Sequence, residues 1–384
     1  MRNLQLINKI KRIYIGFIIS LATIIVWLII FEIALRIFYP QSLSPSFSPT
    51  NDRGTFTEYD PLLGWRLKPN AEGNFFSGEF QTFIKNNEQG LRMNRTISLK
   101  KSKFRIAFLG DSNVWGFGIY DKDRMSEQLE KMLNDTEVLN FGVSGYGTDQ
   151  YYLELNATVL KYNPDRVITT FYPNDLIEAG NHEINGYPKP FFNITPKGLI
   201  LTNVPVPQRK NWDYRSYSII VRLNFFLSHT LDTYVLIKPL LHKVYEELKG
   251  HGTVVPYWIE IIKIRPTKEY DGYLNLNEKI YCEMSHFLRK RNVSLTVVSI
   301  PHRSYLIQKE LKTQLKEYHV NESEIDIQRP SVIMSSLSRK CGFNFVDMIP
   351  YFRNSSNPQE FYYMFDEHLT AKGHLLIAEI LSKD

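Results

Sequence analysis

The sequence predicts an α/β protein: a three-layer α/β/α sandwich with about five parallel strands, preceded by one N-terminal transmembrane helix. Short apolar runs alternate with stretches of helical length, which is the pattern of a parallel sheet covered by helices on both faces. One uncharged apolar stretch near the N-terminus is much longer than these runs. The composition, with 43% hydrophobic and 22% charged residues among 384, is ordinary for a globular protein and excludes a disordered or fibrous chain.

Residues 13–31 form the long stretch, nineteen residues without a charge. At a rise of about 1.5 Å per residue they nearly span the hydrocarbon core of a bilayer. A cleaved signal peptide, the alternative, would have a shorter apolar stretch and a small-x-small cleavage site. Lys9, Lys11 and Arg12 precede the stretch and only Arg36 closely follows it, so the positive-inside rule keeps the N-terminus in the cytoplasm. We expect a single-pass protein of the cytoplasmic membrane whose remainder is periplasmic or extracellular.

The formal net charge of +6 is concentrated at the N-terminus. Five basic residues and one acidic residue within the first 36 supply four of the six charges. The remainder is nearly neutral, so the charge balance gives no reason to expect a nucleic-acid partner.

Residues 40–100 join the expected anchor to the sheet. Prolines, serines and threonines predict an extended tether over 40–58, and the turns that follow predict a small β lead-in that buries Phe75, Phe80 and Phe83. We interpret the lead-in as a structural apron rather than a substrate-contacting surface, because aromatics alone do not define a site. The expected domains are 1–39, 40–100 and 101–384, the last with an insertion at 176–268.

The sheet itself is expected from residue 104 onward. The apolar runs predicted as strands are 104–109, 138–141, 167–171, 294–300 and 344–346. The predicted helices lie near 124–133, 149–161, 274–291 and 329–340, with a last helix from Thr370. In open parallel sheets, sites form beyond the carboxyl ends of the strands, so polar residues at those positions are the candidates for chemistry.

Ser112 follows the first strand in the tight turn Gly110-Asp111-Ser112. A serine hydroxyl is inert unless a base removes its proton and preorganised donors receive the oxyanion, so other segments must supply both. Such segments follow in order: a glycine-rich stretch with Gly145 after the second strand, Asn174 after the third, and Asp366 with His368 near the C-terminus.

Together these segments resemble the SGNH (GDSL-like) hydrolase family, from about Arg105 to the C-terminus apart from the insertion. The resemblance implies that Ser112 is the nucleophile, His368 the general base and Asp366 the residue that orients the imidazole. It also implies an oxyanion hole made by the backbone N–H groups of Ser112 and Gly145 and the side-chain amide of Asn174. No cofactor is expected.

Two positions depart from the family pattern. Tyr172 stands where a glycine is usual, which narrows the space beside Asn174, and Asp366 precedes His368 by two residues instead of three. In an extended loop, residues two apart point to the same side, so Asp366 is still expected to reach His368 Nδ1 while Glu367 faces away. A more distant carboxylate, or backbone carbonyls alone, is the alternative.

Three other polar residues near these motifs are expected to have structural rather than catalytic roles. Asp111 and Asp175 should hydrogen-bond the loops that carry the serine and the asparagine, and His374 should be a helix residue rather than a second base. The remaining histidines are scattered without a helical His-x3-His or a Cys-His cluster, so no metal site is expected.

The two cysteines, Cys282 and Cys341, give no disulfide framework. An extracytoplasmic location permits a disulfide, but the spacing does not require one, and buried free thiols are favoured. The aromatic- and proline-rich insertion has two interpretations of equal weight: a substrate lid over the serine, or a helical hairpin that packs on the sheet edge or on the bilayer surface.

These inferences predict a membrane-anchored serine esterase or acyltransferase. A nearly neutral domain outside the membrane suits a substrate that carries O-acyl esters, with acetyl favoured, on a cell-envelope or surface polysaccharide. A membrane acyltransferase is the protein partner considered. The alternatives are a lipase or lysophospholipase acting on a lipid ester, and a catalytically silent glycan-binding or assembly factor.

Overall fold

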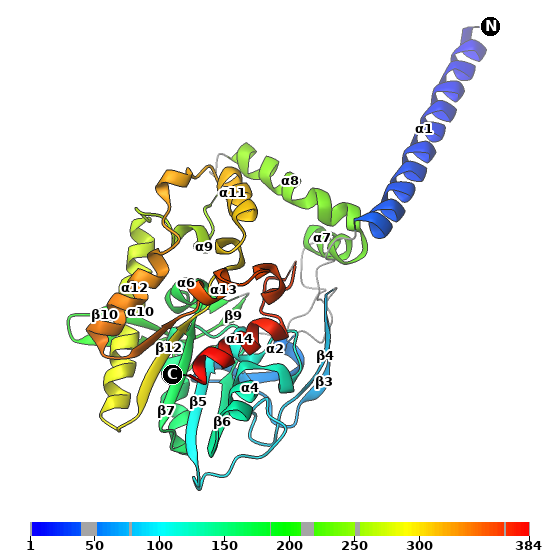
Figure 1. Cartoon of the computed structure of the whole chain (residues 1–384). Coiled ribbons are helices and arrows are strands. Elements are labelled where there is room, and N and C mark those ends of the chain that lie inside the picture. The colour runs from blue at the N-terminus through cyan, green and yellow to red at the C-terminus, as the bar shows by residue number, and fades with distance from the viewer. Residues whose placement is uncertain are drawn as a thin grey trace. The chain divides into compact units, whose positions relative to one another are not determined.

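Five parallel strands form the central sheet, in the order β13-β12-β7-β5-β6 (Figure 1). They are β5 (Phe104–Gly110), β6 (Thr136–Gly142), β7 (Arg166–Phe171), β12 (Ser294–Ser299) and β13 (Asn344–Asp347). Each corresponds to a predicted strand, with its ends shifted by at most two residues. Strand β5 pairs with both β6 and β7, so its carboxyl end lies between theirs.

The structure, a computed structural model, describes residues 2–39, 52–76, 79–184, 186–208, 219–249, 254–364 and 366–383. The chain divides into two compact units. The smaller comprises Met1–Phe47 with Asp213–Gly252, and the larger comprises Ser48–Trp212 with Thr253–Asp384. Most of the predicted tether, residues 40–51, lies outside the described residues.

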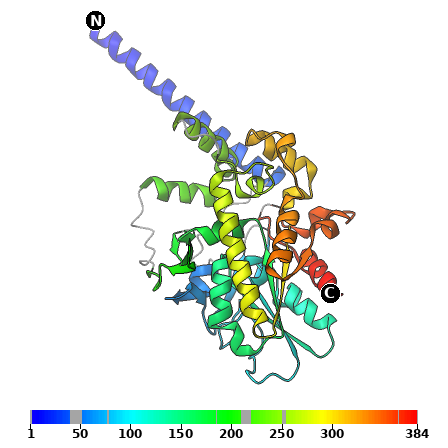
Figure 2. The same cartoon turned by 90° about the vertical axis from the view of Figure 1, so that its left-hand side faces the viewer.

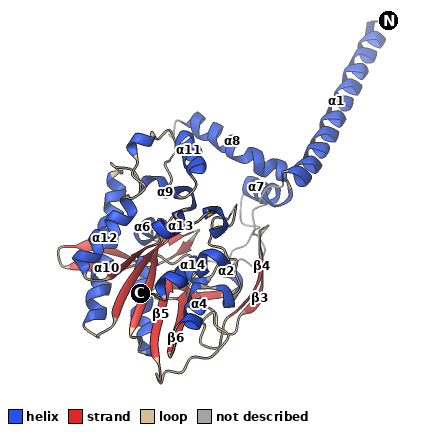
Figure 3. Ribbon diagram, viewed as in Figure 1, coloured by secondary structure: helices blue, strands red, loops and turns tan. Residues whose placement is uncertain are grey.

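Alternate side chains of the sheet enter two separate hydrophobic cores. Ala107 and Leu109 of β5 belong to one core, and Ile106 and Phe108 belong to the other, because successive residues of a strand face opposite sides. The first core is completed by α5 (Thr148–Ala157), α10 (Lys268–Arg289) and α12 (Arg329–Cys341), and the second by α4 (Met125–Met132), α13 (Ile349–Arg353) and α14 (Ala371–Leu381). The predicted three-layer sandwich is confirmed (Figure 3), and Figure 2 shows the long helix α10 in yellow on one face.

Short elements surround this sandwich. Four antiparallel hairpins are formed by β1 (Thr57–Asp60) with β2 (Gly64–Leu67), β3 (Glu72–Phe76) with β4 (Gln81–Lys85), β8 (Glu183–Ile184) with β9 (Tyr187–Pro188), and β10 (Phe191–Thr195) with β11 (Gly198–Thr202). The short helices are α2 (Asp52–Thr55), α3 (Ser112–Trp115), α6 (Asn174–Gly180), α9 (Tyr257–Glu260) and α11 (Gln308–Glu317). The hairpins β8–β9 and β10–β11 occupy the start of the insertion, where no strand was predicted.

The lead-in packs against the sheet through only some of its predicted aromatics. Phe75 is buried, with its ring centroid 4.9 Å from that of Phe117 and 5.7 Å from that of Trp115, and Phe80 packs partly buried beside it. The prediction for Phe83 is wrong, because its side chain is 46% exposed. Its neighbours Thr82 and Ile84 occupy the inward face of β4, which leaves Phe83 on the outer face.

The described residues of the smaller unit form the helices α1 (Arg2–Phe38), α7 (Ile219–Thr230) and α8 (Asp232–Lys249). Within α1, the 28 residues Lys11–Phe38 reach a mean hydropathy of 2.7 over their most apolar window. This helix is long and apolar enough to cross a membrane, and a signal sequence would pass the same test.

Cys282 and Cys341 form a disulfide that joins α10 to the end of α12, with their Cα atoms 4.6 Å apart. The preference for free thiols is therefore wrong. The two positions are 59 residues apart in sequence, and they meet because α10 and α12 pack side by side on one face of the sheet. Because the two cysteines are so far apart in sequence, no local sequence pattern indicates that they meet.

Candidate active site

Ser112 begins the short helix α3 immediately beyond the carboxyl end of β5. Asp111 caps this helix, because its Oδ1 accepts a hydrogen bond of 2.9 Å from the backbone N–H of Asn113. Burial raises the pKa of the Asp111 carboxyl, and hydrogen bonds from Asn113 and from the side chain of Asn174 oppose that shift. The neighbouring strand approaches so closely that a Cβ on Gly142 would lie 2.3 Å from the backbone nitrogen of Trp115.

His368 lies between Ser112 and Asp366. Its Nε2 is 2.9 Å from Ser112 Oγ, and its Nδ1 is hydrogen-bonded to Asp366 Oδ1. The imidazole stacks on the ring of Phe117, with centroids 4.1 Å apart and planes 15° from parallel. The side chains of His368 and Asp366 are 26% and 14% exposed, so part of the imidazole reaches solvent while the carboxylate is largely enclosed.

The loop that carries Asp366 and His368 is not extended, contrary to the expectation from their spacing. Glu367 between them has a φ of 65°, in the left-handed region that non-glycine residues rarely adopt. This bend brings the side chains of Asp366 and His368 together and sends that of Glu367 elsewhere. Glu367 Oε2 lies 3.1 Å from Nε2 of the buried His302.

His302 is 1% exposed, and its hydrogen bonds define its tautomer. Its Nδ1 accepts from the backbone N–H of Ser304 at 3.2 Å, so the proton of the neutral ring is on Nε2 and is donated to Glu367. Trp258 of α9 stacks on the ring at 4.9 Å. Burial alone would raise the pKa of the Glu367 carboxyl, but the hydrogen bond from His302 holds it below its ordinary value.

The lead-in also holds this loop. Glu79 accepts hydrogen bonds from the backbone N–H of Met364 at 2.6 Å and of Asp366 at 2.8 Å. Tyr363 donates its hydroxyl to the carbonyl of Gly118 at 2.9 Å, and Phe80 packs against its ring. These contacts support the interpretation of the lead-in as structural, because they hold the loop that carries His368 in place.

The predicted oxyanion-hole residues lie beyond the ends of three adjacent strands. Gly145, with a φ of 76°, is the third residue of a turn closed by a hydrogen bond of 3.2 Å from Tyr146 N–H to Val143 O, where type II geometry favours glycine. Among the described residues, neither the backbone N–H of Ser112 nor that of Gly145 has a hydrogen-bond acceptor.

Asn174, the remaining predicted donor, is the first residue of α6, and its buried Oδ1 has no hydrogen-bond partner among the described residues. Asp175 holds the loop before it, because its carboxylate accepts from Tyr172 N–H and from the hydroxyl of Tyr151, each at 2.7 Å. The structural roles expected of Asp111 and Asp175 are thus confirmed.

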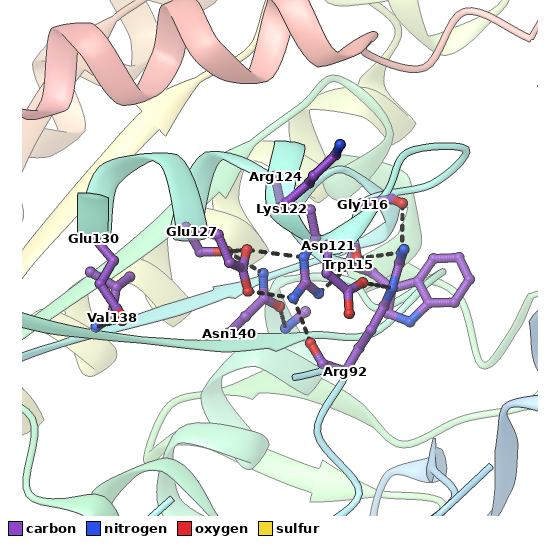
Figure 4. A network of polar contacts seen from close by, with 12 residues as sticks. Arg92, Trp115, Gly116, Asp121, Lys122, Arg124, Glu127, Glu130, Val138 and Asn140 are labelled. Atoms are coloured by element: carbon purple, nitrogen blue, oxygen red, sulfur yellow. Dashed lines mark hydrogen bonds and ion pairs between the residues drawn. The ribbon is translucent and has the colours of Figure 1, made fainter. Parts of the chain in front are cut away.

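Two buried arginines fix the segment that follows Ser112 (Figure 4). Arg92 from the lead-in donates to the carbonyls of Trp115 at 2.9 Å, Gly116 at 2.6 Å and Ile119 at 2.6 Å. It is paired with Asp121 at 2.8 Å, and Arg124 donates to the Arg92 carbonyl at 2.5 Å. Burial, with a smaller contribution from Arg124, lowers the pKa of Arg92 to about 9, which leaves it charged at neutral pH.

His374 is a buried residue of α14, as expected. Its Nδ1 accepts a hydrogen bond from the backbone N–H of Met125 at 3.2 Å, and burial lowers its pKa to about 3, which makes this imidazole a poor proton acceptor. Among the described residues, no group of three or more His, Cys, Asp or Glu side chains is arranged to hold a metal ion.

The sequence interpretation missed four residues that hold the site: Glu79, Arg92, Phe117 and His302. Arg92 lies between two apolar residues, Leu91 and Met93, and an arginine in that setting is a signal that could have been used. The other three stand in no motif, and their partners are distant in sequence.

No family model and no curated protein matches the chain. Solved structures similar to it include a protein of the G-D-S-L family from Desulfitobacterium hafniense DCB-2, with 12% identity over 73% of this chain and 98% of that one and a TM-score of 0.35. A lipase/acylhydrolase from Enterococcus faecalis has 12% identity, coverages of 73% and 94%, and a TM-score of 0.36. The acetyl xylan esterase AlAXEase has 16% identity, coverages of 73% and 98%, and a TM-score of 0.39.

The first of these proteins is described as a member of the G-D-S-L family, which the sequence motifs resemble. At such identities and TM-scores the similarity says nothing about activity. The assignment of chemistry to this chain rests on the hydrogen-bonded side chains at the end of β5 and on the sheet that carries them.

Proposed function

We propose that this protein is a serine ester hydrolase of the SGNH type. The observation that carries the proposal is the chain of hydrogen bonds from Ser112 Oγ through His368 to Asp366 at the carboxyl end of a central strand. This is the arrangement that activates a serine: a base within hydrogen-bond distance of the hydroxyl and a carboxylate that orients the base.

The proposed reaction has two stages. His368 Nε2 takes the proton of Ser112 while Oγ attacks the ester carbonyl, and the same proton then passes to the departing alcohol. Water, or a hydroxyl of an acceptor sugar in the case of transfer, attacks the resulting acyl-serine in the same way. Asp366 stabilises the imidazolium that forms in each stage.

The proposed oxyanion hole comprises the backbone N–H groups of Ser112 and Gly145 and the side-chain amide of Asn174. Its support is that the backbone N–H groups of Ser112 and Gly145 have no hydrogen-bond acceptor within the part of the chain that the structure describes. One such donor typically contributes about 3 kcal/mol to transition-state stabilisation.

For the substrate we propose O-acyl esters, with acetyl favoured, on a cell-envelope or surface polysaccharide. The preference for a small acyl group comes from the sequence, in which Tyr172 stands near Asn174 where a glycine is usual. A location outside the cytoplasm is supported by the apolar helix near the N-terminus and by the disulfide between Cys282 and Cys341, since disulfides persist mainly in oxidising compartments. The comparisons offer no support for a membrane acyltransferase partner, and the proposal does not include one.

Lipase or lysophospholipase activity is the second candidate, favoured by the apolar surface of α7 and α8 in the unit that contains the expected anchor. The catalytically silent alternative loses its main support, which was the short spacing between Asp366 and His368, because these two side chains are hydrogen-bonded.

Activity of the full-length protein in detergent micelles toward p-nitrophenyl acetate, p-nitrophenyl octanoate, an O-acetylated glycan and a phospholipid tests the proposal. We expect hydrolysis of the acetyl esters and a loss of at least about 10³-fold in Ser112→Ala. Preference for octanoate and phospholipid would favour the lipase candidate. An inactive wild-type protein that binds glycan would contradict the enzymatic proposal.

A further inference from the structure

In the described part of the smaller unit, most large apolar side chains are exposed, and two of the three buried side chains are polar. Among its described residues, the buried side chains are only Leu35, Ser228 and Asp232. The exposed large apolar side chains of its hairpin, which we define as α7 with α8, are Ile219, Leu223, Phe226, Leu236, Ile237, Leu240, Leu241 and Val244. In a water-soluble protein, large apolar side chains are mostly buried. Their exposure here is the arrangement expected where lipid replaces water as the solvent.

We propose that the hairpin lies on the lipid bilayer at the outer end of α1, with its apolar side chains in the boundary between head groups and acyl chains. The proposal rests on the anchoring by α1 that the proposed function includes, and adds an interaction surface to it. The protein would then meet the membrane through three helices, α1, α7 and α8, instead of one.

The exposed apolar residues form one stripe on each helix. On α7, Leu223 and Phe226 follow Ile219 by four and seven residues, and on α8 Leu240 and Val244 follow Leu236 at intervals of four. Lys238 lies on another side of α8 and donates to the buried Ser228 at 3.1 Å. Each helix therefore has the amphipathic form of a helix that lies in a membrane surface.

Contacts with α1 set the depth of the hairpin. The carboxylate of Glu32 accepts hydrogen bonds of 2.9 Å from the backbone N–H groups of Asp232 and Thr233, the first residues of α8. Arg36 donates to the carbonyl of Thr230, the last residue of α7, at 2.5 Å. Glu32 directly follows the uncharged residues 13–31, so the bend between α7 and α8 is attached where the expected hydrocarbon span ends.

Lipid is favoured over a protein partner because the stripes belong to the same compact unit as the exposed apolar surface of α1. The hairpin sequence carries four lysines and arginines against three aspartates and glutamates, so burial of apolar side chains, rather than attraction to anionic lipids, is the expected driving force. Coverage by the rest of this chain acting as a lid, or by a second copy, gives a different result in the test below.

Site-directed spin labelling of the full-length protein in phosphatidylcholine vesicles tests the proposal. Nitroxides are attached to Leu223→Cys and Leu240→Cys in the hairpin stripes, and to Ile24→Cys in α1. Lys238→Cys on α8 and Lys290→Cys in the larger unit are the controls. The native cysteines are held in a disulfide and do not react with the label. Retained ester hydrolysis shows that each variant is folded.

We expect the labels at Leu223 and Leu240 to be accessible to oxygen and protected from a water-soluble nickel complex, as at Ile24, while both controls remain accessible to nickel. Nickel access at Leu240 equal to that at Lys290 would overturn the proposal. Immobilised labels shielded from both reagents would also overturn it, because they would show coverage by protein. Nickel access at Ile24 would show that α1 does not anchor the protein in the membrane. Protection at Ile24 without protection at Leu223 and Leu240 would show that α1 anchors the protein but that the hairpin does not lie on the bilayer.

Discussion

His368 is held on three sides, by Asp366 at Nδ1, by Ser112 at Nε2 and by the stacked ring of Phe117. A neutral imidazole can act as a base toward Ser112 only if its proton is on Nδ1, and the Asp366 carboxylate selects that tautomer. The side chain of Glu367 adjoins Asp366 in sequence but contacts His302. The two acidic residues of this loop therefore have separable effects on activity.

Asp366→Asn is expected to lower kcat by about 10⁴-fold, because an amide can donate to Nδ1 and so favours the wrong tautomer. Glu367→Gln should remain near wild type, since its side-chain carbonyl still accepts from His302. Steady-state kinetics of both variants, with thermal melts to exclude unfolding, provide the measurement. A severe loss in Glu367→Gln beside a near-normal Asp366→Asn would refute this assignment.

Glu367→Ala, in contrast, is expected to lower kcat by roughly 10²-fold with little change in KM. Without the hydrogen bond to His302, nothing offsets the cost of the positive φ, and a shift of the loop by about 1 Å is enough for such a loss. Glu367→Gln is the matched control, because it keeps the acceptor. Equal kcat values for the two variants would show that His302 does not position the loop.

At the scale of elements, the chain segment after α3 depends on an arginine supplied by the lead-in. Arg92 binds the carbonyls of Trp115, Gly116 and Ile119, and so joins the lead-in to the backbone that follows α3. The β lead-in is thus part of the folded core of the larger unit and not a spacer beside it.

Arg92→Met is expected to lower the free energy of unfolding by about 3–5 kcal/mol, because it removes the ion pair with Asp121 and the hydrogen bonds to three backbone carbonyls. Chemical denaturation of the full-length protein in micelles measures the change. Lys122→Met is the control, because Lys122 is exposed and directly follows Asp121, the partner of Arg92. It should change the free energy of unfolding by less than about 0.5 kcal/mol. Similar stabilities of the two variants would contradict the role given to Arg92.

At the scale of the whole molecule, the five strands and the main helices were predictable, because apolar runs of strand length and segments of helical period are local signals. The segments that carry Ser112, Gly145, Asn174, Asp366 and His368 were recognisable for the same reason. The contacts of Glu79, of Arg92 and of His302 were not, since each joins segments far apart in sequence. The bend at Glu367 was missed because spacing alone does not define a backbone conformation.

The disulfide between α10 and α12 ties together two helices of one layer. The chain-entropy model gives a stabilisation of about 4 kcal/mol for its loop, whose sequence separation is 59 residues. We expect the double variant Cys282→Ser, Cys341→Ser to melt at a lower temperature than the oxidised protein and to be insensitive to reductant. A wild-type melting temperature unaffected by reduction would show that the bond does not form or does not stabilise the fold.

The most direct test of the central claim is covalent labelling of the full-length protein with a fluorophosphonate, followed by peptide mass spectrometry. Activated serines react with this reagent and ordinary hydroxyls do not, because the reaction needs the adjacent base and the oxyanion hole. We predict one modified residue, Ser112, with labelling abolished in His368→Ala and slowed in Asp366→Asn. Failure of Ser112 to react in a protein that hydrolyses esters, or labelling that persists in His368→Ala, would contradict the proposed mechanism.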